Sequence, residues 1–391
     1  MKKCRLPKKL NNTSIELDCT KLAGILKRVD SVTKFSESTD AMTHIHLLVA
    51  YQGDVFILGR TPDTFVAHHL AGAKAEADTA FNIDPNQLVG VINKRGLSTL
   101  TFDGAEVEIK ENKGRYKAKF KVRTLSSEQI PMVQEGLRHH VEGGQTLNKE
   151  FITKLADGVR LTRLRDPYTN AAVICRVETD GKNIQVTSPG TFTSAQFKSK
   201  LKAKCPKFRF SLSGDMFDLI YKFIGADDIE IHADTSSFTA ESADFVVSLP
   251  PLQSNDEDYR YLDTLLEALG PSVFTTKIKG DLSAPFENIQ SIVDKKSQAN
   301  ATIKLAKKEM KISFANDSGS VSDSVKLAKE VKTPLTCKLD MKILKDMLKH
   351  IGREPEHEMS FKGSSIGELK AFTLSYDQED HTLIYLGYIP A

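Results

Sequence analysis

Lysine and arginine residues recur on the faces and at the ends of the helices that the sequence predicts. In the last of these helices Lys342, Lys345 and Lys349 share one face, opposite the apolar residues of the same segment. The other members of the set are Lys27, Arg28, Lys34, Lys94, Arg95, Lys154, Lys222, Lys295 and Lys296. One basic helix end is most simply a solvated face that complements the helix dipole. Six such helices would instead offer a repeated row of cations suited to a phosphate backbone, without reading base sequence.

Residues that could support catalysis or bind a metal show no comparable pattern. His44 and His46 would share a strand face and could hold a metal ion, but no third ligand is indicated. Packed or exposed strand histidines are the simpler interpretation. The sequence has no GxxxxGK[ST] phosphate loop. We therefore expect no catalytic residue, no metal site and no cofactor.

Composition sets the outer limits of the interpretation. The chain has 391 residues, 40% of them apolar and 27% charged, with a net charge of +3, which is typical of a globular protein of two to four domains. No apolar run is long enough to span a membrane, and the five cysteines form no CxxC pair, which favours a reducing, cytoplasmic compartment. The basic segment 1–10 lacks the apolar core of a signal peptide, so we expect a loose arm that touches phosphates.

The basic residues are carried by a unit that is clearest between Phe81 and Arg95. A short strand leads to Asp84, a helix N-cap candidate, and Pro85 suits the first helical position. Lys94 and Arg95 are expected in the last turn, and Gly96 is the expected stop. The unit is thus a strand, a cap, a short amphipathic helix and a basic end.

The same unit recurs through the chain. Its expected caps are Asp18, Asp84, Asn148, Ser213, Asp281 and Asp340, spaced by about 65 residues, or about one sixth of the chain. Any α+β protein has capped helices at intervals, but here the strand, the cap and the helix recur in the same register. The sequence therefore predicts six related repeats.

Between the helices the sequence predicts antiparallel strands, so the fold class is α+β. Residues 43–50 and 54–60 would form a hairpin around Gln52-Gly53, and Gly-containing turns recur at Asp103-Gly104 and Asp180-Gly181. Residues 301–305 and 310–314 would form two separate strands. Connector-like segments at 126–144 and 250–258 divide the repeats into pairs. The predicted domains are 1–133, 134–258 and 259–391, each with two repeats.

This layout resembles the bacterial sliding clamp, the β subunit of the replicative DNA polymerase, in a form suggestive of a bacteriophage. The resemblance spans most of the chain and is strongest in FNIDPNQLVGVINK, in Gly114-Arg115-Tyr116, in 125–131, in 257–262 and in the tail 388–391. It implies the DNA-clamp fold: three domains of two β-α-β-β-β repeats each, with antiparallel sheets outside and helices lining a central channel. It also implies a homodimeric ring that encircles duplex DNA as a processivity factor in DNA replication, within a bacterial or infected cell.

Simple geometry also favours a dimer. Six helices about 10 Å wide, side by side, would leave an opening of about 9 Å, whereas twelve would leave about 28 Å, enough for a duplex. A closed head-to-tail homodimer would pair edge strands of the first and third domains, which are otherwise open to aggregation.

The resemblance implies protein partners as well. In the family, the polymerase and the clamp loader place a short peptide in an apolar cleft between the second and third domains. By position the cleft residues would be Tyr261, Leu262, Tyr388, Ile389 and Pro390. The chain departs from the family in two places, with Glu257 where proline is common and Lys182-Asn183 in place of a His-Arg pair.

Two alternatives stay open. A protein with the clamp fold could act as a docking platform, for example in viral transcription or repair, without closing a homodimeric ring. An unrelated α+β enzyme could carry a coincidental repeat, and a deep pocket with converging titratable groups would be its sign.

Overall fold

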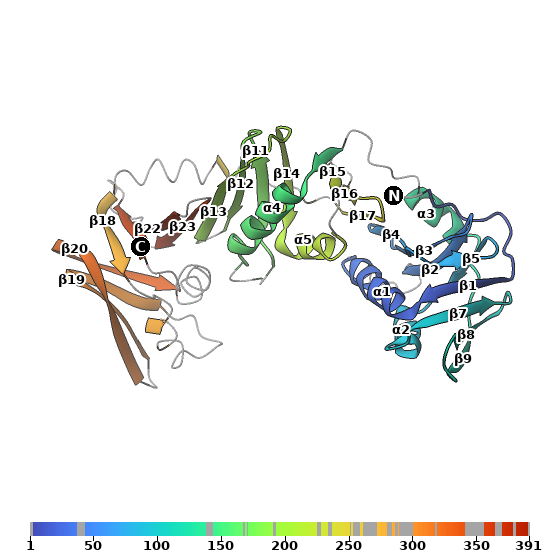
Figure 1. Cartoon of the computed structure of the whole chain (residues 1–391). Helices are drawn as coiled ribbons and strands as arrows, with labels where there is room; N and C mark the ends of the chain where they lie inside the picture. Colours follow the sequence, from blue (N-terminus) through green and yellow to red (C-terminus); the bar gives the residue numbers. More distant parts are fainter. Residues whose placement is uncertain are drawn as a thin grey trace. The chain divides into compact units, whose positions relative to one another are not determined.

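The architecture follows the predicted repeats (Figure 1). The computed structural model describes residues 3–36, 44–137, 144–166, 169, 171–190, 193–224, 228–233, 237–250, 252, 259–260, 272–279, 284–285, 288, 300–316, 319–340, 356–363, 370–377 and 381–389. Among these residues, all pairing between the strands is antiparallel.

Each of the first four repeats has one strand, one helix and three further strands. The first comprises β1 (Thr13–Asp18), α1 (Cys19–Thr33), β2 (Ile45–Tyr51), β3 (Asp54–Arg60) and β4 (Phe65–His69). The second comprises β6 (Thr79–Asn82), α2 (Pro85–Ile92), β7 (Leu97–Phe102), β8 (Glu106–Glu111) and β9 (Lys117–Lys121). The third comprises β10 (Gln145–Leu147), α4 (Lys149–Leu161), β11 (Ile174–Thr179), β12 (Asn183–Pro189) and β13 (Thr193–Lys200). The fourth comprises β14 (Phe208–Ser213), α5 (Gly214–Tyr221), β15 (Ile229–Ala233), β16 (Phe238–Glu241) and β17 (Phe245–Leu249).

The remaining elements lie between the repeats or near the C-terminus. They are β5 (Lys74–Ala75), α3 (Gln129–Gly136), β18 (Ser272–Lys279), β19 (Asn300–Asn316), β20 (Gly319–Asp340), β21 (Glu356–Gly363), β22 (Lys370–Asp377) and β23 (His381–Ile389). The expected fifth and sixth helices fall largely or wholly outside the described residues.

Neighbouring repeats exchange their first strands. Each strand that precedes a helix pairs with the first strand after the helix of the companion repeat: β1 with β7, β2 with β6, β10 with β15, and β11 with β14. The same exchange places β18 beside β21. Each pair of repeats therefore shares its sheets.

The strands form three sheets, and the two larger ones cross the predicted domain boundaries. Their orders are β5-β1-β7-β8-β9, β10-β15-β16-β17-β4-β3-β2-β6 and β14-β11-β12-β13-β23-β22-β21-β18-β20-β19. Pairing of β4 with β17 and of β13 with β23 makes the two larger sheets continuous. Compact packing divides the chain into a first unit, Met1–Lys149 with Met216–Leu252, and a second unit, Glu150–Asp215 with Gln253–Ala391. The boundaries 1–133, 134–258 and 259–391 stay predictions.

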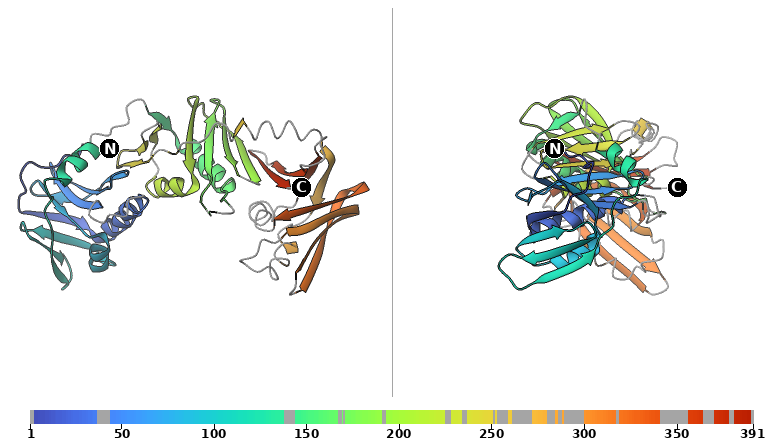
Figure 2. Two further views of the ribbon diagram at one scale, coloured as in Figure 1. Left: turned by 180° about the vertical axis from the view of Figure 1, so that it is seen from behind. Right: turned by 90° about the vertical axis from the view of Figure 1, so that its right-hand side faces the viewer.

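Local sequence explains the helices of the first unit. The Asp18 carboxylate accepts hydrogen bonds from the backbone N–H groups of Thr20 (2.8 Å) and Lys21 (3.2 Å), which confirms the predicted cap of α1. Asp84 caps α2 in the same way, with Pro85 at the first helical position. Helix α1 packs on β3, β4 and α2, and the three views agree on this arrangement (Figures 1 and 2).

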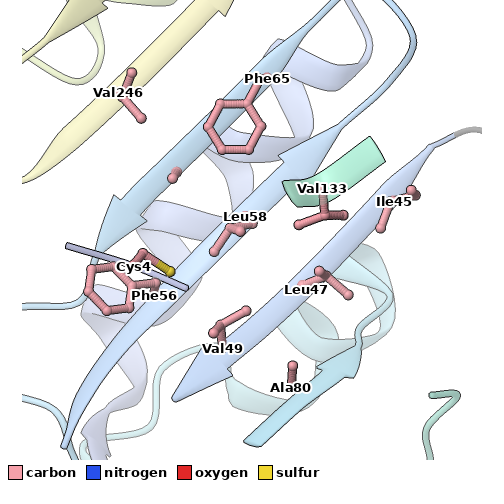
Figure 3. Close-up of a cluster of buried hydrophobic side chains, with 11 residues drawn as sticks. Cys4, Ile45, Leu47, Val49, Phe56, Leu58, Phe65, Ala80, Val133 and Val246 are labelled. Carbon is pink, nitrogen blue, oxygen red and sulfur yellow. The ribbon is translucent and has the colours of Figure 1, made fainter. Parts of the chain in front are cut away.

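The sheet that contains β2, β3 and β4 has a second apolar core on the face opposite α1, which the sequence did not predict. Alternate residues of β2, β3 and β4, including Phe56 and Phe65, pack with Cys4 from the N-terminal segment and Val133 from α3 (Figure 3). Gly136 lies so close to Phe65 that an added Cβ atom would be 2.4 Å from its ring. The expectation of a loose arm is therefore wrong for Cys4, which is 7% exposed, and the connector contains a helix.

Three further expectations need correction. Helix α2 ends at Ile92, so Lys94 and Arg95 lie beyond its last turn, and Lys94 rather than Gly96 has positive φ, +63°. The sequence also missed β4 and β13, the strands that join neighbouring predicted domains. Finally, the two separate strands expected within 301–314 form one strand, β19, which pairs with β20 in a long irregular hairpin.

Candidate nucleic-acid interface

Helix α1 and its C-cap residue carry half of the candidate cations of the first unit. Its buried face contains Leu22, Ile25 and Val29, because these positions recur at helical spacing. Lys27 and Lys34 are exposed on the other side. Lys21 is exposed as well, seven residues before Arg28, and the same spacing argument could have identified it. The Nζ atom of Lys34 is 2.5 Å from a carboxylate oxygen of Asp30, so part of its charge is neutralised.

Arg28 joins α1 to the end of α5. Its Nη1 donates a hydrogen bond of 3.0 Å to the carbonyl oxygen of Lys222, the residue that follows α5. This contact satisfies one of the carbonyls that a helix leaves without a partner at its C-terminus. The side chain of Lys222 is exposed. The first unit therefore brings Arg28 and Lys222 together, although 194 positions separate them in the sequence.

Lys94 and Arg95 follow α2 and differ in their surroundings. Lys94 is exposed. The Arg95 guanidinium carbon lies 4.0 Å from the centre of the Tyr116 ring, a cation–π contact, and Tyr116 donates a hydrogen bond to the carbonyl of Val91. The Thr20 hydroxyl donates to the carbonyl of Arg95 at 2.9 Å and so joins the start of α1 to the end of α2. Arg95 is thus mainly a packing residue, and Lys94 is the available cation.

In the second unit Lys154 is half-exposed on α4. Two arginines after this helix, Arg163 and Arg165, both form ion pairs with Asp215, the latter at 2.9 Å. Their charge is therefore partly balanced. The predicted cations Lys295, Lys296, Lys342, Lys345 and Lys349 lie outside the described residues.

Only part of the predicted peptide cleft can be described. Tyr261, Leu262 and Pro390 lie outside the described residues, while the backbones of Tyr388 and Ile389 belong to β23, opposite Ala371 and Lys370. Two residues before Tyr261 in the sequence, Tyr259 is 6% exposed and donates a hydrogen bond of 3.3 Å to the carbonyl of Ile174. The Arg176 guanidinium carbon lies 3.5 Å from the centre of its ring. Nothing in the spacing of these residues predicted this anchor.

His46 and His69 are packing residues. His46 Nε2 lies 2.8 Å from the hydroxyl of Thr33, and burial lowers the pKa of His46 to about 4, despite the opposing attraction of Asp30. His69 is buried between Asp54 and Asp244, with ring nitrogens 3.1 and 3.3 Å from their carboxylate oxygens. Within the described part of the chain, no three His, Cys, Asp or Glu side chains are grouped to hold a metal ion.

The second unit contains a cavity of about 510 Å³ along the β19–β20 hairpin. Lys311 is the one titratable residue in a lining that is otherwise made of serine, threonine, alanine, valine and phenylalanine. Acid–base catalysis needs converging titratable groups, which this cavity does not provide. Across the described residues, no helix has the length and apolarity to cross a membrane.

Comparison with known proteins identifies the architecture. The DNA polymerase III β subunit of Thermotoga maritima matches over 97% of this chain and 99% of its own, with a TM-score of 0.76 and 14% identity. The Bacillus subtilis sliding clamp matches over 97% and 99%, with a TM-score of 0.74 and 14% identity. The C. crescentus β sliding clamp matches over 97% and 100%, with a TM-score of 0.75 and 13% identity.

This chain has the sliding-clamp fold. The predicted α+β class and its β-α-β-β-β repeats are confirmed by these matches together with the element order. No protein-family model matches the sequence, and no curated protein matches it either. At 13–14% identity the likeness establishes the fold, and residue roles have to be argued from the chain itself.

Proposed function

We propose that the chain is a sliding clamp, a processivity factor without an active site that encircles duplex DNA and tethers a replicative DNA polymerase. The observation that carries the proposal is the strand exchange between repeats, which recurs three times and coincides with a match to solved clamps over 97% of the chain. Exposed cations on or just after the repeat helices, such as Lys27, Lys94 and Lys222, support it. They would hold phosphates without reading sequence.

The proposal includes a head-to-tail homodimer of three-domain subunits, with the helices lining the channel. Its support is the width argument, since the helices of one chain enclose too small an opening for a duplex. Light scattering at micromolar concentration should therefore give twice the chain mass of 43.4 kDa. We further propose that it acts in the cytoplasm of a bacterium, or of one infected by a phage.

The decisive experiment measures topological linkage to DNA. The full chain is mixed with nicked circular plasmid, a bacterial clamp loader and ATP, and bound protein is separated by gel filtration. The protein should stay with the circle and be lost after one double-strand cut. Equal retention on circular and linear DNA would refute the proposal, as would failure to load where a bacterial clamp loads alongside.

A pair of matched variants tests the cations. The double variant Lys27→Ala, Lys94→Ala should bind DNA more weakly. The slope of log K against log salt concentration should become less steep by about one for each phosphate that is no longer bound. The control is Lys182→Ala with Lys204→Ala, which removes the same charge from exposed positions outside the helices. The same loss of affinity in both double variants would mean that only net charge matters.

We also propose a peptide-binding cleft for the polymerase and the clamp loader at Tyr261, Leu262, Tyr388, Ile389 and Pro390. Other clamps bind ligands: the C. crescentus clamp holds polyethylene glycol at a region associated with β-motif tethering, and a Pseudomonas aeruginosa clamp binds griselimycin. Leu262→Asp should abolish binding of a clamp-binding peptide, measured by fluorescence anisotropy, whereas Leu97→Asp, at an exposed site on β7, should not.

One observation favours the second candidate, a docking platform that does not close a homodimeric ring. In the first and third repeats the last strand joins the sheet of the next domain, through β4 and β13. In the fifth repeat, the strands that follow the expected helix belong to the long β19–β20 hairpin. The sheet edge available for pairing with another subunit therefore differs from the edges formed by β4 and β13. A monomeric mass in solution, with no retention on circular DNA, would support this candidate over the clamp.

A further inference from the structure

Tyr221 is an exposed aromatic side chain at the end of helix α5. It is 49% exposed, and the other exposed large hydrophobic residues of the described chain, Leu10, Leu97 and Ile130, are aliphatic. Its ring is not loose, because it stacks on Phe217 one turn earlier, with ring centres 5.5 Å apart and planes inclined by 29°. One face of α5 therefore presents an ordered aromatic surface to solvent.

The chain after Tyr221 is firmly anchored in the first unit. Phe223 donates its backbone N–H to the carbonyl of Ile220 at 2.9 Å and is 5% exposed. Its ring packs against His68 of β4, at 5.8 Å between centres, and Phe245 of β17, at 5.5 Å. Tyr221 thus lies two residues from a core contact, so little conformational entropy would be lost when a ligand binds to it.

The surroundings of Tyr221 are mainly cationic. Lys222 is exposed, and the Arg28 guanidinium is held at the carbonyl of Lys222 by the 3.0 Å hydrogen bond. Lys27, next to Arg28 in α1, is also exposed. Asp218, exposed one turn before Tyr221, offsets one of these three positive charges. An aromatic ring beside a net positive charge suits a ligand with flat rings and phosphates.

We propose that Tyr221 stacks on an unpaired nucleic-acid base, while Arg28 and Lys222 contact the adjoining phosphates. The inference rests on the proposed function, since it assumes that α5 faces DNA. Aromatic rings flanked by cations are the usual way in which proteins bind single strands irrespective of sequence. In an intact duplex both faces of each base are already stacked. The site therefore favours a single-stranded segment, such as the template ahead of a primer end.

The absence of tryptophan from the sequence gives a direct test. Tyr221→Trp introduces a single indole at the site, and Leu97→Trp introduces one at an exposed control position on β7. Oligothymidylate should quench the fluorescence of the Tyr221→Trp protein, and a blunt duplex of equal length should quench it much less. The Leu97→Trp protein should respond to neither. Quenching should weaken as salt is raised.

Affinity measurements separate stacking from charge. A base–aromatic stack changes affinity by about 5- to 150-fold. Tyr221→Ser should therefore weaken oligothymidylate binding by at least about fivefold, and Tyr221→Phe, which keeps the ring, should restore it. Circular dichroism of each variant checks that the fold is retained.

Two results would overturn the inference: equal quenching of the Tyr221→Trp and Leu97→Trp proteins by oligothymidylate, or unchanged affinity in the Tyr221→Ser protein. A response to blunt duplex as strong as to the single strand would also overturn it. The proposed function fails by a different measurement, loss of wild-type retention on circular plasmid. If the wild-type protein is retained on circular plasmid but the Tyr221→Trp protein shows no selective quenching, the clamp function is supported and the Tyr221 site is refuted. If the Tyr221→Trp protein is selectively quenched but the wild-type protein is not retained, the Tyr221 site is supported and the clamp function is refuted.

Discussion

Acidification should destabilise the first unit through His46 on β2. This side chain is 10% exposed, and its Nε2 lies 2.8 Å from the hydroxyl of Thr33, at the end of α1. Burial lowers the pKa of His46 to about 4 from an ordinary value of 6.5. Between these two pH values the unfolded chain binds a proton that the folded chain excludes. The free energy of unfolding therefore falls as the pH is lowered from 6.5 towards 4.

The size of the effect follows from the two pKa values. Each unit of difference corresponds to about 1.4 kcal/mol, so the full loss is about 3.5 kcal/mol, of which about 2.5 kcal/mol is lost by pH 4.5. His46→Gln keeps a hydrogen-bonding group near Thr33 but cannot titrate. Between pH 7.5 and pH 4.5 the free energy of unfolding of His46→Gln should therefore fall by about 2.5 kcal/mol less than that of the wild type.

The assay is urea unfolding followed by far-ultraviolet circular dichroism at pH 7.5, 6.5, 5.5 and 4.5. The control is His232→Gln, on β15, which makes the same substitution at a half-exposed histidine. If the wild-type and His46→Gln curves run parallel over this range, His46 is not held neutral by burial and the reasoning is wrong.

Three backbone and capping sites give further predictions, all measurable as shifts in urea midpoint. Asp84→Ala should lower the free energy of unfolding by about 1 kcal/mol, because two N–H groups of α2 lose their acceptor, while Asp84→Asn should retain most of it. Gly136→Ala should destabilise by about 1–3 kcal/mol, since the new Cβ would be 2.4 Å from the Phe65 ring; an unchanged midpoint would show that α3 is not packed there. Gly90→Ala should stabilise α2 by up to about 1 kcal/mol, because nothing lies within 4 Å of its Cβ position.

The sequence predicted the parts of the fold whose causes are local. Asp18 and Asp84 are recognisable as caps because a carboxylate before an apolar helical pattern satisfies the first N–H groups. The Gln52-Gly53 hairpin is confirmed with φ of +53° and +84°, and Gly104 and Gly181 also adopt positive φ. These features need only a few neighbouring residues, so they can be inferred without knowing the rest of the chain.

Features that depend on distant partners were missed. Strand β4 has apolar residues on both faces, because α1 covers one side and Cys4 and α3 contribute to the core on the other, so its pattern does not alternate. The role of Arg28 depends on a carbonyl 194 positions away, and Arg95 is committed to Tyr116. A count of cations along a helix cannot separate such residues from Lys27 and Lys94, which are exposed.

The position of the described cations has a common physical origin. In α2 the short exposed face is occupied by Asn86, Gln87 and Gly90, and the charge comes two residues after the helix, at Lys94. Lys34 is the C-cap of α1, and Lys222 directly follows α5. Cations at these positions are stabilised by the negative end of each helix dipole, and Lys34 is also paired with Asp30. Lys94 and Lys222 are exposed at helix ends, where contact with a phosphate backbone costs little and can be exchanged readily as the backbone moves.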